Sequence, residues 1–192
     1  PYYYHGEDDE GRITLYLGSA FGPGSGQVWM AEGDQPGANL GWSVGTAGDV
    51  NGDGYADVLV GAFEYDNGQQ DEGRAYLYHG GPSGLASSPA WTVDGNQTEA
   101  RMGCEVNTAG DVNGDGTDDV FAAWSEASYS GAACLSGIDG ALIWVSGSVT
   151  GAETSLCLKA IPDIDGDGIM DLAAGTEADS SVTVLSGADG TL

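Results

Sequence analysis

Apolar residues occur in this sequence as short runs separated by acidic, glycine-rich turns. Residues 58–60 (VLV) are apolar at every position, whereas residues 12–17 and 181–185 alternate apolar and other side chains. A run that is apolar on both faces predicts a strand sandwiched between neighbouring sheets, because a half-exposed strand alternates. Long helical periodicities are scarce, and 34 of the 192 residues are glycine. The pattern predicts an all-β protein of short strands and tight turns.

The same pattern returns along the chain. A shift of 62 residues places Asp49 on Asp111, and a further shift of 52 places Asp111 on Asp163. The second unit is shorter mainly in a connection, which spans 7 residues from 137 to 144 and 11 residues from 80 to 91. Insertions and deletions belong in surface loops, so the repeat is structural.

Each unit contains four predicted strands, in an order that is set by the repeat. The first strands are residues 41–47, 103–109 and 155–161, and the second strands are residues 57–62, 119–123 and 171–174. The third strands are residues 12–17, 74–78, 132–135 and 181–185, and the fourth strands, each with a tryptophan, are residues 28–30, 90–93 and 142–145. Four-stranded antiparallel sheets packed face to face around an axis form a β-propeller.

We therefore expect an incomplete propeller. It divides into a partial blade of two outer strands at 1–40, blades at 41–102 and 103–153, and a partial blade at 154–192. A closed propeller needs at least four complete blades. The thirteen predicted strands are too few to close one, and we expect the isolated chain to associate through its incomplete terminal blades.

Three acidic loops join the first and second predicted strands: residues 49–57 (DVNGDGYAD), 111–119 (DVNGDGTDD) and 163–171 (DIDGDGIMD). Each has oxygen-bearing side chains at positions 1, 3, 5 and 9 and a glycine at position 6, where a sharp turn is needed. Calcium takes six to eight oxygen ligands. We predict three calcium sites, in which position 7 contributes its backbone carbonyl. The predicted ligands are Asp49, Asn51, Asp53, Tyr55, Asp57, Asp111, Asn113, Asp115, Thr117, Asp119, Asp163, Asp165, Asp167, Ile169 and Asp171.

Two other interpretations of these loops compete with metal binding. Asn-Gly and Asp-Gly pairs also mark ordinary hairpin turns, but three copies that each repeat the acid at position 9 favour metal binding. An EF-hand needs a bidentate acid at position 12 and flanking helices. Position 12 is Val60, Ala122 or Ala174 here, and apolar strand residues follow each loop. These loops lead directly into strands and are not EF-hands.

The residues around the first loop resemble a known repeat. Leu40-Gly41-Trp42-Ser43-Val44 precedes the loop and Val60-Gly61-Ala62-Phe63 follows it, which is similar to the FG-GAP repeat of the integrin α-chain head and of many bacterial secreted proteins. The segments LSGIDG at 135–140 and LSGADG at 185–190 resemble the bacterial type. The resemblance implies a β-propeller with calcium in its loops and an extracellular, secreted or cell-surface location.

Composition limits the classes of partner. The chain has 30 acidic and 4 basic residues and a net charge of −26, so it repels nucleic acid and anionic lipid. It is nevertheless 41% hydrophobic with five Trp and nine Tyr, enough for a folded core. No apolar stretch approaches the ~20 residues needed to cross a bilayer. The chain opens with Pro1 and shows no signal peptide, so we expect a processed protein or a segment of a longer one.

Residues with catalytic or redox chemistry are few. The only histidines are His5 and His79, and we expect His79 to be a partly buried structural residue. The run 2–4 (YYY) and the tryptophans could stack on sugars, but packing is favoured. Three cysteines, Cys104, Cys134 and Cys157, do not form a disulfide framework. Buried thiols are favoured, and a bridge between Cys104 and Cys157 is left open because they hold similar places in successive repeats.

Three functions are compatible with these observations. The first is a non-enzymatic, calcium-binding extracellular adhesion or interaction module that binds a protein or glycan partner. The second is a structural subunit of a fibre or shell, in which copies of the chain pair end to end through unpaired strand edges. The third is an accessory domain of a secreted polysaccharide-active enzyme, for which the sequence offers least. Fold alone does not decide among them.

Overall fold

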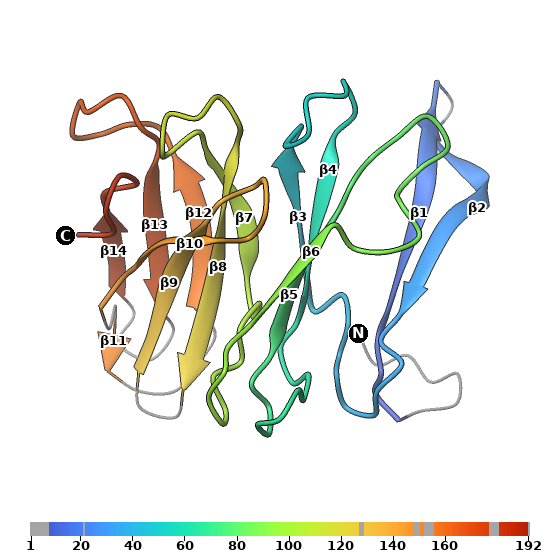
Figure 1. Cartoon of the computed structure of the whole chain (residues 1–192), viewed down its shortest axis with the longest axis horizontal. Helices are drawn as coiled ribbons and strands as arrows, with labels where there is room; N and C mark the ends of the chain where they lie inside the picture. The colour runs from blue at the N-terminus through green and yellow to red at the C-terminus, as the bar shows by residue number, and fades with distance from the viewer. Residues whose placement is uncertain are drawn as a thin grey trace.

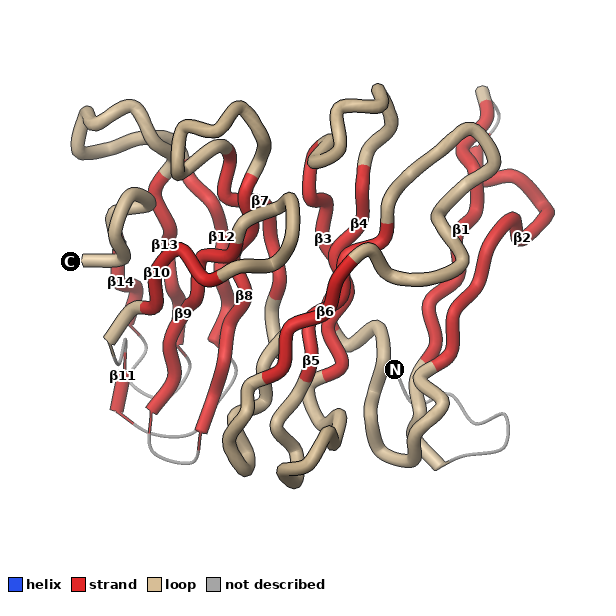
Figure 2. Tube along the Cα trace, in the orientation of Figure 1, coloured by secondary structure: helices blue, strands red, loops and turns tan. Residues whose placement is uncertain are grey.

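The computed structural model describes residues 8–20, 22–126, 129–147, 150–151, 156–176 and 181–191. Across these residues it contains fourteen strands and no helix, which confirms the all-β prediction. The strands form four antiparallel sheets that follow one another from right to left in Figure 1. Loops gather at the two ends of the sheets, above and below the strands (Figure 2). None of the described segments could span a membrane as an apolar helix.

Each sheet is a meander in which consecutive strands are neighbours. The first sheet pairs β1 (Arg12–Ser19) with β2 (Gly22–Glu32). The second contains β3 (Ser43–Gly48), β4 (Asp57–Ala62), β5 (Arg74–Tyr78) and β6 (Trp91–Asp94). The third contains β7 (Val106–Gly110), β8 (Asp119–Glu126), β9 (Tyr129–Leu135) and β10 (Leu142–Val145), with β11 (Thr150–Gly151) also on β9. The fourth contains β12 (Leu156–Ile161), β13 (Asp171–Thr176) and β14 (Ser181–Leu185).

The order of two, four, four and three strands is the predicted one, and these are consistent with FG-GAP propeller blades. The additional strand β11 was not predicted. It pairs only two residues with the far end of β9, at Ser130 and Tyr129. So short a pairing has no apolar periodicity that a sequence pattern could reveal.

The strands β4 and β8 are buried on both faces, as the apolar run of β4 predicted. In β4, Leu59 packs in a cluster shared with the third sheet, while Val60 packs in a cluster shared with the first sheet. In β8, Val120 and Phe121 divide in the same way between the second and fourth sheets. The core is therefore three apolar layers, one between each pair of adjacent sheets.

Tryptophans of the outer strands connect adjacent sheets. The Trp91 indole N–H donates to the carbonyl of Gly137 in the next sheet at 2.9 Å. Trp144 donates to Gly187 at 2.8 Å, and Trp29 donates to the carbonyl of Ala86 at 3.0 Å. Trp91 and Trp144 are buried, so the packing role predicted for the tryptophans is confirmed for these two.

The outer faces of the first and last sheets carry exposed apolar side chains. On β2, Val28 and Met30 are exposed while the intervening Trp29 packs inward. On β14, Val182 is 72% exposed and Val184 is also exposed. Large exposed apolar patches are typical of surfaces that contact another protein.

All three cysteines are free. Cys134 is buried, as predicted, and Cys104 is partly buried. Cys157 is exposed, so the prediction of a buried thiol is wrong there, and no bridge joins it to Cys104. Cys157 lies on β12, at the edge of the fourth sheet. At Cys104, burial raises the pKa of the thiol to about 12.

The inter-sheet tryptophan bond can be tested by Trp91→Phe. The free energy of unfolding should fall by about 1–3 kcal/mol, because the buried carbonyl of Gly137 loses its donor. Trp42→Phe is the matched control, since Trp42 is 43% exposed and its ring contacts Phe63 at a tilted angle. It should change stability by less than about 0.5 kcal/mol. Equal midpoints for both variants in urea unfolding would contradict the role of Trp91.

Candidate metal centre in the acidic loops

The three acidic loops lie at the same end of the molecule, at the top of Figure 1. They join β3 to β4, β7 to β8 and β12 to β13. Their position-1, position-3 and position-5 side chains are exposed, whereas the position-9 aspartates are buried. The exposed set is Asp49, Asn51, Asp53, Asp111, Asn113, Asp115, Asp163, Asp165 and Asp167.

The position-1 carboxylate shapes each loop by accepting backbone N–H groups. Asp49 accepts from the amides of Asp53 at 3.0 Å and Gly54 at 2.8 Å. Asp111 and Asp163 accept from Gly116 and Gly168, both at 2.9 Å. The position-6 glycines have φ of +88°, +90° and +91°, which explains why glycine recurs there.

The side chains at positions 3 and 5 continue the same local pattern. The Asn51 side-chain oxygen accepts from the amide of Asp53 at 2.9 Å, and Asp53 accepts from Tyr55 at 2.9 Å. Equivalent bonds run from Asp115 to Asn113 and from Thr117 to Asp115 in the second loop. Each carboxylate or amide oxygen is thus held in place by the backbone two residues further on.

The third loop brings its acids closest together. One oxygen from each of Asp163, Asp165 and Asp171 lies within 4.8 Å of the others, and the structure shows no second group of three acids this close in its described residues. Asp167 lies outside the group. The first two loops carry asparagine at position 3, which supplies an amide oxygen instead of a carboxylate.

The position-9 aspartate has a structural role that the sequence did not reveal. Asp57 is fully buried and accepts from the amides of Val50 at 2.8 Å and Gly80 at 2.6 Å. These amides belong to position 2 of the loop and to the turn after the third strand. One carboxylate therefore connects the acidic loop to the turn that follows β5 in its own sheet.

The other two sheets repeat this arrangement. Asp119 accepts from Val112 at 2.9 Å and from Gly137 at 3.2 Å. Asp171 accepts from Ile164 at 2.7 Å and Gly187 at 3.2 Å. Burial raises the pKa of Asp119, although these N–H bonds act in the opposite direction. At exposed Asp163, bonds from the amides of Gly166 and Gly168 lower the pKa and favour the anion.

Three glycines that donate to position 9 complete the site. A Cβ atom on Gly137 would lie 2.0 Å from the carbonyl oxygen of Asp118, and one on Gly187 would lie 1.8 Å from that of Met170. A Cβ on Gly80 would lie 2.2 Å from the carbonyl of Ala56. Only glycine fits, so their recurrence at one place in each repeat was the signal that could have identified them.

Gly137 also links the loop to the neighbouring sheet. Its N–H donates to Asp119 while its carbonyl accepts from the Trp91 indole. Gly187 likewise donates to Asp171 and accepts from Trp144. In the second and third loops, the position-9 aspartate is therefore connected through one glycine to a tryptophan of the neighbouring sheet.

His79 lies beside the first loop, partly buried as the repeat predicted, with Nδ1 3.5 Å from Asp57 Oδ2. The other sequence candidates, His5 and the tyrosines at 2–4, lie outside the described residues.

The structural role of position 9 predicts an effect that is independent of metal. In chelator, Asp119→Asn should lower the free energy of unfolding by about 1–3 kcal/mol, because an amide N–H₂ would then face the N–H donors of Val112 or Gly137. Asp115→Asn is the control, since Asp115 is exposed and an asparagine oxygen can still accept from Thr117. It should change stability by less than about 0.5 kcal/mol. Equal losses for the two variants in urea unfolding would contradict this assignment.

Comparison with known proteins agrees with this architecture. A family model described as FG-GAP repeat matches residues 40–78, which contain the first acidic loop with β3, β4 and β5. Mouse integrin alpha-IIb is 34% identical over 174 residues, covering 79% of this chain, and Xenopus laevis integrin alpha-4 is 32% identical over 169 residues, covering 82%. Drosophila melanogaster integrin alpha-PS2 is 43% identical over 102 residues, covering 48%.

The chain spans only a small part of these relatives: 16% of integrin alpha-IIb, 16% of integrin alpha-4 and 7% of integrin alpha-PS2. Within that part, the repeat match, the tandem antiparallel sheets and the acidic loops coincide. The chain is an FG-GAP repeat protein of the integrin α-like type.

Proposed function

We propose that the chain is a non-enzymatic, calcium-binding interaction module of an extracellular β-propeller. The observation that carries this proposal is the recurrence of one loop conformation in three sheets, with exposed oxygens at positions 1, 3 and 5 and a buried carboxylate at position 9. An ordinary hairpin turn does not need four oxygen-bearing side chains at fixed spacing.

The donor set fits a hard cation. Carboxylate, amide and carbonyl oxygens are the ligands that calcium prefers, and it tolerates irregular geometry better than magnesium does. The close carboxylates of Asp163, Asp165 and Asp171 support a site in the third loop. Asn51 and Asn113 give the first two loops one fewer negative charge, so we expect weaker binding there than in the third loop.

Bound calcium would stabilise the blades. Without a cation the carboxylates of each loop repel one another, and the whole chain carries a charge of −26. The position-9 aspartates connect each loop to the turn that also receives a tryptophan in the second and third junctions. Binding in the loops would therefore favour the packing of one blade on the next.

The relatives support a role in adhesion and an extracellular or cell-surface location. Integrin α chains act through protein interactions, and the partner of this chain would be a protein or glycan. The division into blades at 41–102 and 103–153, with partial blades at 1–40 and 154–192, belongs to the same proposal.

Calcium binding is tested by calorimetry and thermal unfolding. Calorimetry should count three calcium ions, and Asp57→Ala should reduce the count to two. Calcium at a hundredfold excess over Kd should raise the melting temperature by at least about 5 °C relative to chelator, since one site then contributes about 2.7 kcal/mol. Magnesium should stabilise less because it requires a smaller octahedral site.

Asp139→Asn is the control for this experiment, because Asp139 is exposed in a turn outside the acidic loops. It should leave three ions bound. An unchanged melting curve in excess chelator would contradict the proposal, and three ions still bound by Asp57→Ala would contradict the ligand assignment.

Self-assembly is a second candidate, favoured by the exposed apolar faces of the terminal sheets. Val28 and Met30 at one end and Val182 and Val184 at the other offer surface that a neighbouring blade would cover. The negative charge opposes random aggregation and leaves specific pairing. Calcium would promote pairing by lowering the repulsion between chains.

Light scattering in millimolar calcium tests this candidate. We expect a mass above 19.5 kDa that falls towards the monomer in chelator. Val182→Lys with Val184→Lys places charge on the β14 face and should reduce association, whereas Val44→Lys, on an exposed valine of the second sheet, should not. A stable monomer of 19.5 kDa in calcium would exclude self-assembly.

A further inference from the structure

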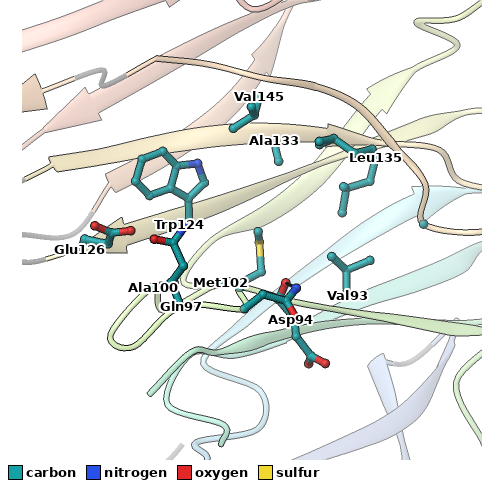
Figure 3. A pocket seen from close by; sticks show the side chains of 14 residues that line it. Val93, Asp94, Gln97, Ala100, Met102, Trp124, Glu126, Ala133, Leu135 and Val145 are labelled. Atoms are coloured by element: carbon teal, nitrogen blue, oxygen red, sulfur yellow. Dashed lines mark hydrogen bonds between the residues drawn. The ribbon is translucent and has the colours of Figure 1, made fainter. Parts of the chain in front are cut away.

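A cavity of about 420 Å³ lies between the second and third sheets (Figure 3). Val93 of β6 and the following residues Ala100 and Met102 line one side, and Trp124 and Leu135 line the other. Trp124 is near the end of β8, whereas the acidic loop precedes the start of β8. The cavity is therefore separate from the candidate metal centre, and its volume is within the range of about 300–1,000 Å³ typical of ligand pockets.

The repeat explains why this space is open. Tyr76 pairs with Val60 across β4 and β5, and Ala133 pairs with Ala122 across β8 and β9, so Tyr76 and Ala133 hold equivalent positions. The Tyr76 ring fills the junction between the first and second sheets and stacks on Tyr78 with centroids 6.2 Å apart. Ala133 leaves the corresponding space empty in the next junction.

The Trp124 side chain fills only part of the space that Ala133 leaves between the second and third sheets. Trp124 stands at the position of Ala62, and its ring lies over Gly131, where a Cβ atom would be 2.5 Å from the indole. Gly131 in turn replaces Arg74, which fills the earlier junction by lying over the Tyr65 ring. Tyrosine rings fill the junction between the first and second sheets. Between the second and third sheets, the Trp124 indole lines one side of an open cavity.

The lining combines an apolar floor with a polar rim. Met102 and Leu135 offer sulfur and aliphatic contacts to a ring, and the Trp124 indole allows edge-to-face packing. Glu126 is on the rim and makes no ion pair with any residue in the described ranges, while Asp94 is already paired with Arg74. The rim can therefore accept a hydrogen bond from a neutral hydroxyl, and its carboxylates repel an anion.

We propose that this cavity binds the side chain of a tyrosine presented by a protein partner, with the ring against Met102, Leu135 and Trp124 and the hydroxyl donating to Glu126. The occupant is indicated by the chain itself, because a tyrosine fills the equivalent space in the preceding junction. The proposal rests on the interaction role proposed above and specifies the chemistry that one contact would recognise.

The test is a titration of the full chain in calcium with N-acetyl-tyrosinamide, followed by NMR of the tryptophan indoles. Trp124→Phe assigns the Trp124 resonance. We expect saturable shifts at Trp124 and binding at least tenfold weaker in Ala133→Tyr, which fills the cavity from within. If that variant does not fold, Ala133→Met fills it partly and should weaken binding at least threefold.

Variants on the rim separate the hydroxyl contact from general packing. Glu126→Gln should weaken N-acetyl-tyrosinamide about fivefold, because a bond to a charged acceptor is stronger than one to a neutral acceptor. It should leave N-acetyl-phenylalaninamide unchanged. Glu99→Gln makes the same charge change on an exposed residue outside the cavity and should affect neither probe.

Three results would overturn the proposal: no saturable shift at Trp124, full binding in Ala133→Tyr, or tighter binding of N-acetyl-argininamide than of the tyrosine probe. The last would assign the cavity to a cationic side chain. None of these results alters the calcium count or calcium-dependent melting, so failure of the cavity and failure of the proposed function are distinguishable.

Discussion

A buried carboxylate accepting at least two backbone N–H groups organises each of the last three sheets. Asp57, Asp119 and Asp171 are 0%, 0% and 2% exposed, and a buried charge without partners is strongly disfavoured. Each is tolerated because it accepts at least one amide N–H from its own acidic loop and one from a distant glycine. The bond to the glycine also brings the third strand to the start of the second, so loop conformation and sheet geometry are fixed together.

The glycine partners explain how one sheet is placed on the next. The Gly137 N–H donates to Asp119 in its own sheet, and the Gly137 carbonyl accepts from Trp91 of the neighbouring sheet. Hydrogen bonds to both sheets therefore hold the peptide groups of Gly137 in place. The first junction is different, since Trp29 donates to Ala86 within a longer connection. The connection that follows the third strand of a sheet differs in length between sheets. The tryptophan of the preceding sheet still donates to a carbonyl in this connection, but the accepting residue differs.

The sequence predicted the local features well and the long-range ones poorly. Strand order and acidic loops follow from apolar runs and oxygen spacing, both of which are visible within ten residues. The need for glycine at 137 arises from the carbonyl of Asp118, nineteen positions earlier in the chain, and is invisible in local pattern. The exposure of Cys157 and the cavity beside Ala133 likewise depend on which sheet packs on which.

Equivalent positions in the repeat are used for different purposes. The residues that carry the hydrogen-bond frame recur, because substituting Asp119 would break bonds within its own sheet and substituting Gly137 would also disturb the bond from Trp91 of the neighbouring sheet. Residues that only fill space are free to differ: Tyr76 and Ala133 occupy the same register without disturbing the pairing of their strands. A repeat framework held by backbone bonds can therefore acquire a cavity in one junction while its neighbour remains packed. In the proposed function, the side chains between the sheets would set binding specificity, and cation binding in the acidic loops would favour the packing of one sheet on the next.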